Sequence, residues 1–282
     1  MNILIATTTN WNSGDDFIRI GVKNILKHVF PKKPNYIHFD RNPNNMIDWP
    51  ANQNIRKGLK GTFMNKPIDW KKINLVVMAG SPEFLHHPLA PIYEGLAEHP
   101  EIPLWCIGVG YSEPKFVVHF TNAELKVLER KSTLIISRQE ELSVRLRFVF
   151  NQTVHTLPCP ALFCFEKFPE KTRGSLTPYQ IAHSLDELTD DTYFDSDPNE
   201  MLNHIGSHSF IITHRLHGAI AGISSGAFVD LINDSFRCRE AIRLFEDVMQ
   251  TGRENITAFK IRILNNYINI LKEHYDKTYP RQ

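Results

Sequence analysis

The sequence predicts an α/β fold with parallel β-sheets, and three observations lead to this prediction. Short apolar runs, typical of buried strands, alternate with segments of helical periodicity about five times before residue 165. The run Asn2–Ala6 is continuously apolar after its first residue, as in parallel sheets covered on both faces. Loops with glycine or polar residues follow the strands, which is typical of sheets whose sites lie at the carboxyl ends of the strands.

The expected elements follow one another in a regular order. The first half is expected to hold strands at residues 2–6, 36–39, 73–78, 103–107, 133–136 and 155–157, and helices starting near Asp15, at 88–99, at 122–131 and after Arg138. The second half is expected to hold strands at 179–183, 192–194, 210–212 and 228–232, and helices at 197–204, from about 218, at 237–250 and at 256–275. The charged stretch Phe165–Thr177, which contains Pro and Gly, is the candidate linker. We therefore expect an N-terminal domain at 1–165 and a C-terminal domain at 178–282.

Composition limits the classes of function. The chain has 282 residues, with a formal net charge of +1 and 22% charged residues, so an extended nucleic-acid-binding surface is not expected. Four cysteines without CxxC spacing indicate buried apolar side chains in a reducing compartment, and no ligand cluster calls for a metal. The N-terminal run is too short for a signal sequence, and no run has the length of a membrane span. We expect a cytoplasmic protein, and leave open a peripheral position at the inner face of the membrane.

The most informative stretch begins with the predicted strand Phe210–Ile212. It continues with His214, Arg215 and His217, and then with small residues that start at Gly218. Cations at the carboxyl end of a strand, beside a helix N-terminus, form a site for an anion. The alternative is a surface loop whose basic residues are merely solvated. The small residues favour the anion site, because a solvated loop does not require such close packing.

The first loop of the chain follows the first strand. Residues 7–16 are polar and contain Gly14, but they lack the GxGxxG pattern of dinucleotide-binding proteins. Asp15 and Asp16 most simply cap the following helix, and a direct contact of Asp15 with substrate is the alternative.

Six motifs occur in the order in which one known family carries them. They are Asn12-Ser-Gly-Asp-Asp16, Met78-Ala-Gly-Ser81, Ile107-Gly-Val-Gly110, Ser137-Arg-Gln-Glu-Glu-Leu-Ser143, Leu157-Pro-Cys-Pro-Ala-Leu162 and Thr213-His-Arg-Leu-His-Gly218. Together they resemble the polysaccharide pyruvyl transferase family, whose most specific motif contains Arg-Leu-His-Gly. Gln139 and Cys159 stand where that family usually has Asp.

The resemblance implies two Rossmann-like parallel-sheet domains that face each other across a cleft, a GT-B-like arrangement. The C-terminal domain is expected to be abridged, because few residues separate Leu162 from Phe210. The implied reaction moves the enolpyruvyl unit of phosphoenolpyruvate onto a sugar of a cell-surface polysaccharide or its lipid-linked oligosaccharide precursor, as a pyruvate ketal. Phosphoenolpyruvate is then a donor substrate, and neither a metal nor a separate cofactor is expected. Whether the chain forms a homo-oligomer stays open.

The resemblance also assigns roles to individual residues. Arg215 is expected to bind the anion, and His217 to act as the acid or as a phosphate clamp. Arg138 would approach from the facing domain. The other candidate substrate-binding residues are Gly14, Asp15, Gly80, Ser81, His86, His214 and Gly218. His86 and His87 are candidates to activate the acceptor hydroxyl, with a structural surface histidine as the alternative.

Two further functions remain open at this stage. A glycosyltransferase of the same fold would use the basic cluster to hold the diphosphate of a nucleotide sugar. A non-catalytic member would keep the anion site as a binding module within a glycan assembly complex, and the abridged C-terminal domain favours it.

Overall fold

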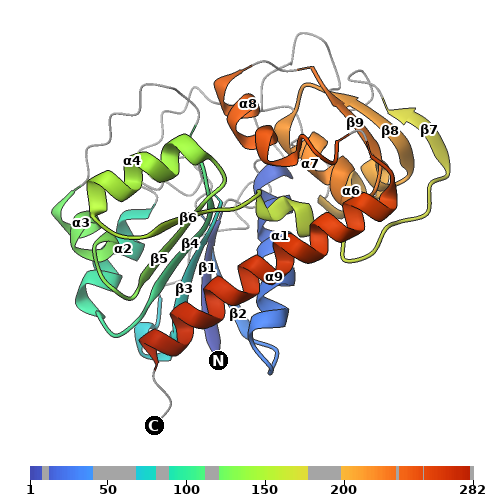
Figure 1. Ribbon diagram of the computed structural model, residues 1–282. Helices are drawn as coiled ribbons and strands as arrows, with labels where there is room; N and C mark the ends of the chain where they lie inside the picture. Colours follow the sequence, from blue (N-terminus) through green and yellow to red (C-terminus); the bar gives the residue numbers. More distant parts are fainter. Residues whose placement is uncertain are drawn as a thin grey trace, which may run out of the picture.

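The computed structural model describes residues 1–7, 13–40, 68–80, 89–111, 121–176, 198–232, 235–249 and 251–279. Within these ranges the chain forms two lobes, each built on a parallel β-sheet with helices against it (Figure 1). The predicted α/β class with two parallel-sheet lobes is confirmed.

The first lobe contains a six-stranded sheet in the order β2-β1-β3-β4-β5-β6, in which every neighbouring pair is parallel. Its strands are β1 (Asn2–Thr7), β2 (Asn35–Asp40), β3 (Leu75–Ala79), β4 (Leu104–Val109), β5 (Thr133–Ser137) and β6 (Val154–Thr156). Because β2 and β3 lie on opposite sides of β1, the order of the strands reverses there. In open α/β sheets a crevice for ligands forms at such a point, beyond the carboxyl ends of the strands.

Helices cover both faces of this sheet. On one face lies α1 (Ser13–Val29). On the other lie α2 (Ala90–Glu98), α3 (Asn122–Leu128) and α4 (Glu140–Phe150). Successive strand residues point to opposite faces, so Ile3 and Ile5 pack on the α1 side while Leu4 packs on the other. This two-sided burial is the reason that the strands are continuously apolar in the sequence.

The second lobe contains the three described strands β7 (Arg173–Leu176), β8 (His208–Thr213) and β9 (Phe228–Leu231), all parallel. The helices of this lobe are α6 (Pro198–Gly206), α7 (Leu216–Ser224) and α8 (Phe236–Ile242), and the 3-10 turn η6 (Arg243–Phe245) continues α8. Strand β7 falls inside the stretch that the sequence indicated as a linker. The predicted strands at 179–183 and 192–194 lie outside the described residues.

One short segment and one long helix join the lobes. The 3-10 turn η4 (Pro160–Phe163) packs against α1 so closely that a Cβ on Gly21 would lie 1.9 Å from the Pro160 carbonyl oxygen. Helix α9 (Arg253–Thr278) starts at the second lobe and crosses to the first (Figure 1). There His274 accepts a hydrogen bond from the Trp105 indole at 3.2 Å, and Tyr275 packs edge-on against Phe30. One apolar core therefore runs through α1, η4, α7 and α9.

Candidate active site

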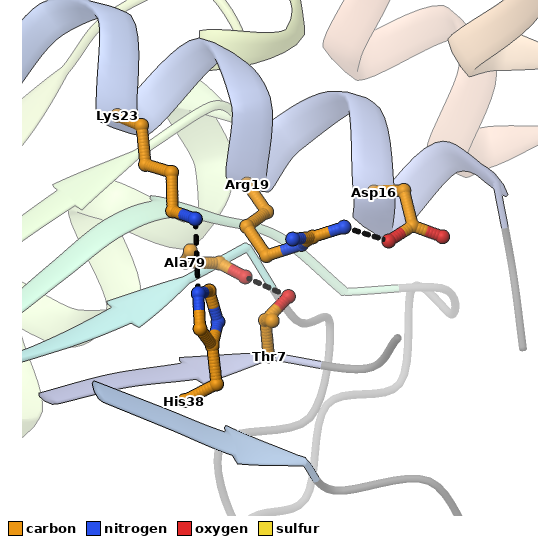
Figure 2. A network of polar contacts seen from close by, with 6 residues as sticks. All are labelled: Thr7, Asp16, Arg19, Lys23, His38 and Ala79. Atoms are coloured by element: carbon orange, nitrogen blue, oxygen red, sulfur yellow. Dashed lines mark hydrogen bonds and ion pairs between the residues drawn. The ribbon is translucent and has the colours of Figure 1, made fainter. Parts of the chain in front are cut away.

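Helix α1 follows β1, the strand at which the strand order reverses. Thr7, the last residue of β1, donates a long hydrogen bond of 3.5 Å from its hydroxyl to the Ala79 carbonyl at the end of β3 (Figure 2). Gly14 and Asp15 lie in the first turn of α1, and Gly14 is buried. The sequence suggested that Asp15 and Asp16 cap this helix. Helix α1 starts earlier, at Ser13, so both residues lie inside its first turn, where they interact favourably with its dipole.

Two glycines turn the backbone at the ends of the central strands. Gly80 follows β3 with φ of +74°, and Gly108 lies in β4 with φ of +78°, values that L side chains rarely adopt. Both also approach neighbouring elements closely. A Cβ on Gly80 would lie 2.9 Å from Cδ1 of Ile18, and one on Gly108 would lie 2.6 Å from Cδ of Pro160. These glycines let the strand ends and the first turns of α1 pack together.

Arg138 lies at the carboxyl end of β5, immediately before α4. Only 1% of its surface is exposed, and its backbone N–H donates to the Val109 carbonyl of β4 at 2.8 Å. The guanidinium lies over the backbone of Gly110, because a Cβ at that position would be 2.5 Å from Nε of Arg138. No carboxylate of the described residues pairs with this guanidinium, and its Nε is buried without an acceptor in that part of the chain. A buried cation of this kind is costly without a counter-ion.

Gln139 fixes the backbone on both sides of Arg138. Its side-chain oxygen accepts from the Tyr111 N–H at 2.6 Å, and its side-chain nitrogen donates to the Tyr111 carbonyl at 3.1 Å. The hydroxyl of Ser137 donates to the carbonyls of Val109 and Gln139. The Gln139 amide thus ties the loop after β4 to the start of α4, because it both donates and accepts.

The second lobe supplies the basic motif from the turn between β8 and α7. Arg215 is the N-cap residue of α7, and its backbone N–H donates to the Thr213 hydroxyl at 2.9 Å. The Arg215 side chain is buried to 4% exposure. Leu216 is buried in the core, and Gly218 is buried in the first turn of the helix. The small residues of α7 do allow close packing, since a Cβ on Gly222 would lie 2.8 Å from Ile211 of β8.

The two lobes meet at Arg138 and His217. Nη1 of Arg138 lies 2.7 Å from Nε2 of His217, and 3.7 Å from Sγ of Cys159. A guanidinium is always protonated, so it donates and the imidazole nitrogen accepts. His217 is therefore neutral in this arrangement. Burial, and then the charge of Arg138, hold the pKa of His217 well below its usual value.

His214 lies beside the same turn. Burial, and to a lesser extent the neighbouring Arg215, lower the pKa of His214. The cationic turn therefore carries its positive charge mainly on arginine at neutral pH. Arginine offers planar, bidentate donors to carboxylate and phosphate groups.

A second polar cluster joins α1 to the edge strand β2 (Figure 2). Lys23 lies 2.9 Å from Nε2 of His38, and Arg19 pairs with Asp16 in the first turn of the helix. Burial and the charge of Arg19 lower the pKa of Lys23 to about 8. Burial and then the charges of Lys23 and Arg19 lower the pKa of His38 to about 4. Among the described residues this cluster contacts neither Arg138 nor His217, so we regard it as a support of α1 against β2.

The structure brings together Arg138, His217 and, through the same turn, His214, Arg215 and Gly218. Gly80 lies at the carboxyl end of β3, and Gly14 and Asp15 lie in the first turn of α1, the helix that follows β1. Ser81, His86 and His87 fall outside the described residues.

Sequence reasoning missed the supports of Arg138, which are Gly110 and Gln139. Gly110 was noted only as part of a motif, and Gln139 only as a departure from one. The signal that pointed to both was their place directly after neighbouring strands, where parallel strands bring residues to one edge.

None of the helices in the described ranges is both long and apolar enough to cross a membrane.

Comparisons with known proteins place the chain in a family. The model of the family "Polysaccharide pyruvyl transferase" matches residues 12–227, well over half of the chain. Comparison with curated proteins gave no match. Among solved structures, an uncharacterized protein from Klebsiella pneumoniae is 10% identical with a TM-score of 0.49, over 89% of this chain and 92% of that one. The S. aureus MnaA–UDP structure is 9% identical with a TM-score of 0.43, over 96% and 91%. On the strength of the family match, the chain belongs to the polysaccharide pyruvyl transferase family and is a transferase.

Proposed function

We propose that this transferase moves the enolpyruvyl unit of phosphoenolpyruvate onto two hydroxyls of a sugar, in a cell-surface polysaccharide or its lipid-linked precursor. The observation that carries the proposal is the contact of Arg138 with His217. It joins a buried cation of the first lobe to the Arg-Leu-His-Gly turn of the second. The family membership supports the reaction class.

The donor matches the charge of the site. Phosphoenolpyruvate carries a carboxylate and a phosphate, and the two lobes each present a buried arginine, Arg138 and Arg215. A ligand anion would supply the counter-ion that Arg138 lacks among the described residues, and would accept from its unsatisfied Nε. The desolvation cost of holding this cation in the free protein is thereby recovered when the donor binds.

The reaction requires one proton to be given and two to be taken away. A proton adds to C3 of phosphoenolpyruvate, and C2 becomes an oxocarbenium-like centre that the first sugar oxygen attacks. The C2–O bond to phosphate then breaks, and the second sugar oxygen bonds to C2. The two hydroxyls lose one proton each: one balances the proton placed on C3, and the other leaves with the phosphate. The products are the ketal and hydrogen phosphate.

His217 supplies the first proton in this scheme. In the free protein its Nε2 accepts from Arg138, so it holds no proton to give from that nitrogen. When the anion draws Arg138 to itself, the nitrogen is released and the adjacent negative charge raises its pKa. His217 then becomes a cationic acid only in the presence of the donor.

Thermal unfolding with and without phosphoenolpyruvate tests the donor. At about 100 times its Kd, the ligand should add ~2.7 kcal/mol of stability, seen as a rise in Tm of several degrees. Arg215→Ala should abolish this rise. Arg262→Ala, which removes an exposed arginine of α9, should retain it. No rise in the wild type at millimolar phosphoenolpyruvate refutes the donor assignment.

A second measurement separates the competing functions. Release of phosphate is followed with a panel of sugars and lipid-linked oligosaccharides. Binding of phosphoenolpyruvate with phosphate release only in the presence of an acceptor supports the transfer. Binding without release from any acceptor indicates a non-catalytic binding module. Protection by a nucleotide sugar in place of phosphoenolpyruvate indicates a glycosyltransferase.

A further inference from the structure

A pocket of about 630 Å³ opens on the molecule away from the Arg138–His217 contact. Three parts of the chain form it: the second half of α1, the segment Phe163–Phe168 and the first half of α9. The α1 residues that line it are Asn24, Lys27 and His28, about three to four turns from Gly14. The lining residue Lys260 donates to the carbonyl and the hydroxyl of Ser224. Ser224 is the last residue of α7, and His217 lies in the first turn of the same helix. The pocket thus lies at the opposite ends of the two helices that reach the active site.

The wall of the pocket is largely apolar. Phe163, Phe165, Phe168, Ile261 and Leu264 line it. The side chain of Ile261 is 56% exposed and lines this concave surface. The volume of the pocket lies within the ~300–1,000 Å³ that small-molecule sites typically have.

The rim of the pocket is cationic. Three lysines, Lys27, Lys167 and Lys260, line it together with one carboxylate, Glu166, which pairs with Lys27. The ammonium of Lys260 donates to the Phe165 carbonyl at 2.8 Å and to the Ser224 carbonyl at 3.1 Å, and lies over the ring of Phe168. No carboxylate of the described ranges balances its charge. Burial lowers the pKa of Lys260 to about 8, which is the effect expected of a cation held without a counter-ion.

An apolar wall beneath a cationic rim matches one class of ligand. We propose that this pocket binds a single-chain anionic amphiphile, with its alkyl or prenyl chain against the phenylalanines and its phosphate or carboxylate head at the exposed Lys167. The charge of Lys260 also attracts the head group, while its ammonium keeps its hydrogen bonds to Phe165 and Ser224. A purely apolar ligand would leave the cations unbalanced, and a small anion would leave the apolar wall in water. Because α1 belongs to the first lobe and α9 spans both, a bound chain would brace the two lobes on this side.

Binding of alkyl phosphates below their micelle concentration tests the proposal without any transfer assay. Affinity should rise on the order of tenfold for each two methylenes from hexyl to octyl to decyl phosphate, as expected for burial of the chain. Decanol and inorganic phosphate, which each lack one half of the ligand, should bind at least tenfold more weakly than decyl phosphate. Equal binding of decanol would refute the role of the cationic rim, and an affinity independent of chain length would refute the apolar wall.

Variants place the ligand in this pocket. Ile261→Glu should weaken binding of decyl phosphate by tenfold or more. Val144→Glu, at a residue of α4 that is 57% exposed and lies outside the pocket, should leave it unchanged. Lys167→Met should weaken the binding of decyl phosphate but not the binding of decanol. Lys33→Met is the matched control, because Lys33 is an exposed lysine that does not line the pocket.

Two outcomes would assign the binding elsewhere and overturn the proposal. Displacement of decyl phosphate by phosphoenolpyruvate would place its head group at the active site. Co-sedimentation with anionic lipid vesicles, unaffected by Ile261→Glu, would indicate a membrane surface in place of a single bound chain. The two proposals are tested separately. Decyl phosphate can bind even if the protein does not catalyse the proposed transfer, and the transfer can occur even if decyl phosphate does not bind.

Discussion

Nη1 of Arg138 and Nε2 of His217 lie 2.7 Å apart, and this hydrogen bond connects the carboxyl end of a strand in the first lobe to the start of a helix in the second. The permanent charge of the arginine fixes the direction of the bond, so the histidine is an acceptor and is neutral. An anion that attracts Arg138 therefore changes the charge state of His217 as well.

Donor binding should consequently take up a proton. At pH 8 the phosphate of phosphoenolpyruvate is already ionised, since such groups titrate near pH ~6. His217 starts neutral, with a pKa that burial and Arg138 hold well below its usual value, and it gains a proton when the bound anion raises that pKa. Uptake means that affinity increases as the pH falls from 8. Calorimetry in two buffers of different ionisation enthalpy measures the number of protons.

His217→Gln is the control for this experiment, because its amide can accept from Arg138 but cannot titrate. The variant should bind phosphoenolpyruvate without proton uptake and should lose transfer activity. Equal uptake in the variant and the wild type would show that the proton goes to another group.

Gly110→Ala should displace Arg138. The added Cβ would lie 2.5 Å from Nε of Arg138 and 3.1 Å from Oε1 of Gln139, so the guanidinium has to move. We expect phosphoenolpyruvate affinity to fall by about tenfold or more, which corresponds to ~1.4 kcal/mol. Gly174→Ala adds the same methyl group where nothing lies within 4 Å, and its affinity should equal that of the wild type. Isothermal titration of both variants decides the matter, and equal affinities would contradict the placement of Arg138.

Gln139→Leu should destabilise the fold of the first lobe. The substitution leaves the N–H and the carbonyl of Tyr111, both bound by this amide, without their partner. Two unsatisfied buried groups cost roughly 2–4 kcal/mol in the free energy of unfolding, measured by urea denaturation. Gln152→Leu removes a single bond to the Leu128 carbonyl in a partly exposed place and should cost about 1 kcal/mol. If Gln139→Leu lowers the free energy of unfolding no more than Gln152→Leu does, the two hydrogen bonds of Gln139 to Tyr111 do not stabilise the lobe as expected.

Removal of two different tyrosine hydroxyls should have different effects on the free energy of unfolding. Tyr267 of α9 donates to the Pro158 carbonyl at 2.8 Å, so Tyr267→Phe should lower the free energy of unfolding by ~1 kcal/mol. The hydroxyl of Tyr36 is buried and has no partner in the described structure, so Tyr36→Phe should be neutral or stabilising. Chemical denaturation of the two variants measures both changes in the free energy of unfolding. Each variant loses one hydroxyl, and only the hydroxyl of Tyr267 has a partner in the described structure.

The sequence was sufficient to predict the elements whose signal is local. The apolar runs of β1 and β3 and a helix after the first of them were expected, because burial on both faces of the sheet leaves a direct trace in the sequence. The approach of Arg138 to the second lobe was also expected, but from the family resemblance and not from the residues. Nothing local in the chain encodes which side chains meet across two lobes.

Other features could not be predicted because their determinants are remote. Strand β7 lies in a charged stretch with Pro and Gly, and it forms because β8 is available to pair with it. The neutral state of His217 depends on Arg138, 79 positions away. Long-range packing decides both features, and for β7 it overrides the local preference that suggested a linker.

Helix α9 has a consequence for the synthesis of the protein. Its last turns cover Trp105 and Phe30, which belong to the core of the first lobe, so that lobe is completed by the final residues of the described chain. Ribosomes add ~5–20 residues per second, so on the order of ten seconds pass between the emergence of β6 and that of α9. During this interval the nascent first lobe exposes an apolar strip that α9 later covers. We expect ribosome-bound chains that stop before α9 to recruit chaperones, and to release them once α9 has emerged.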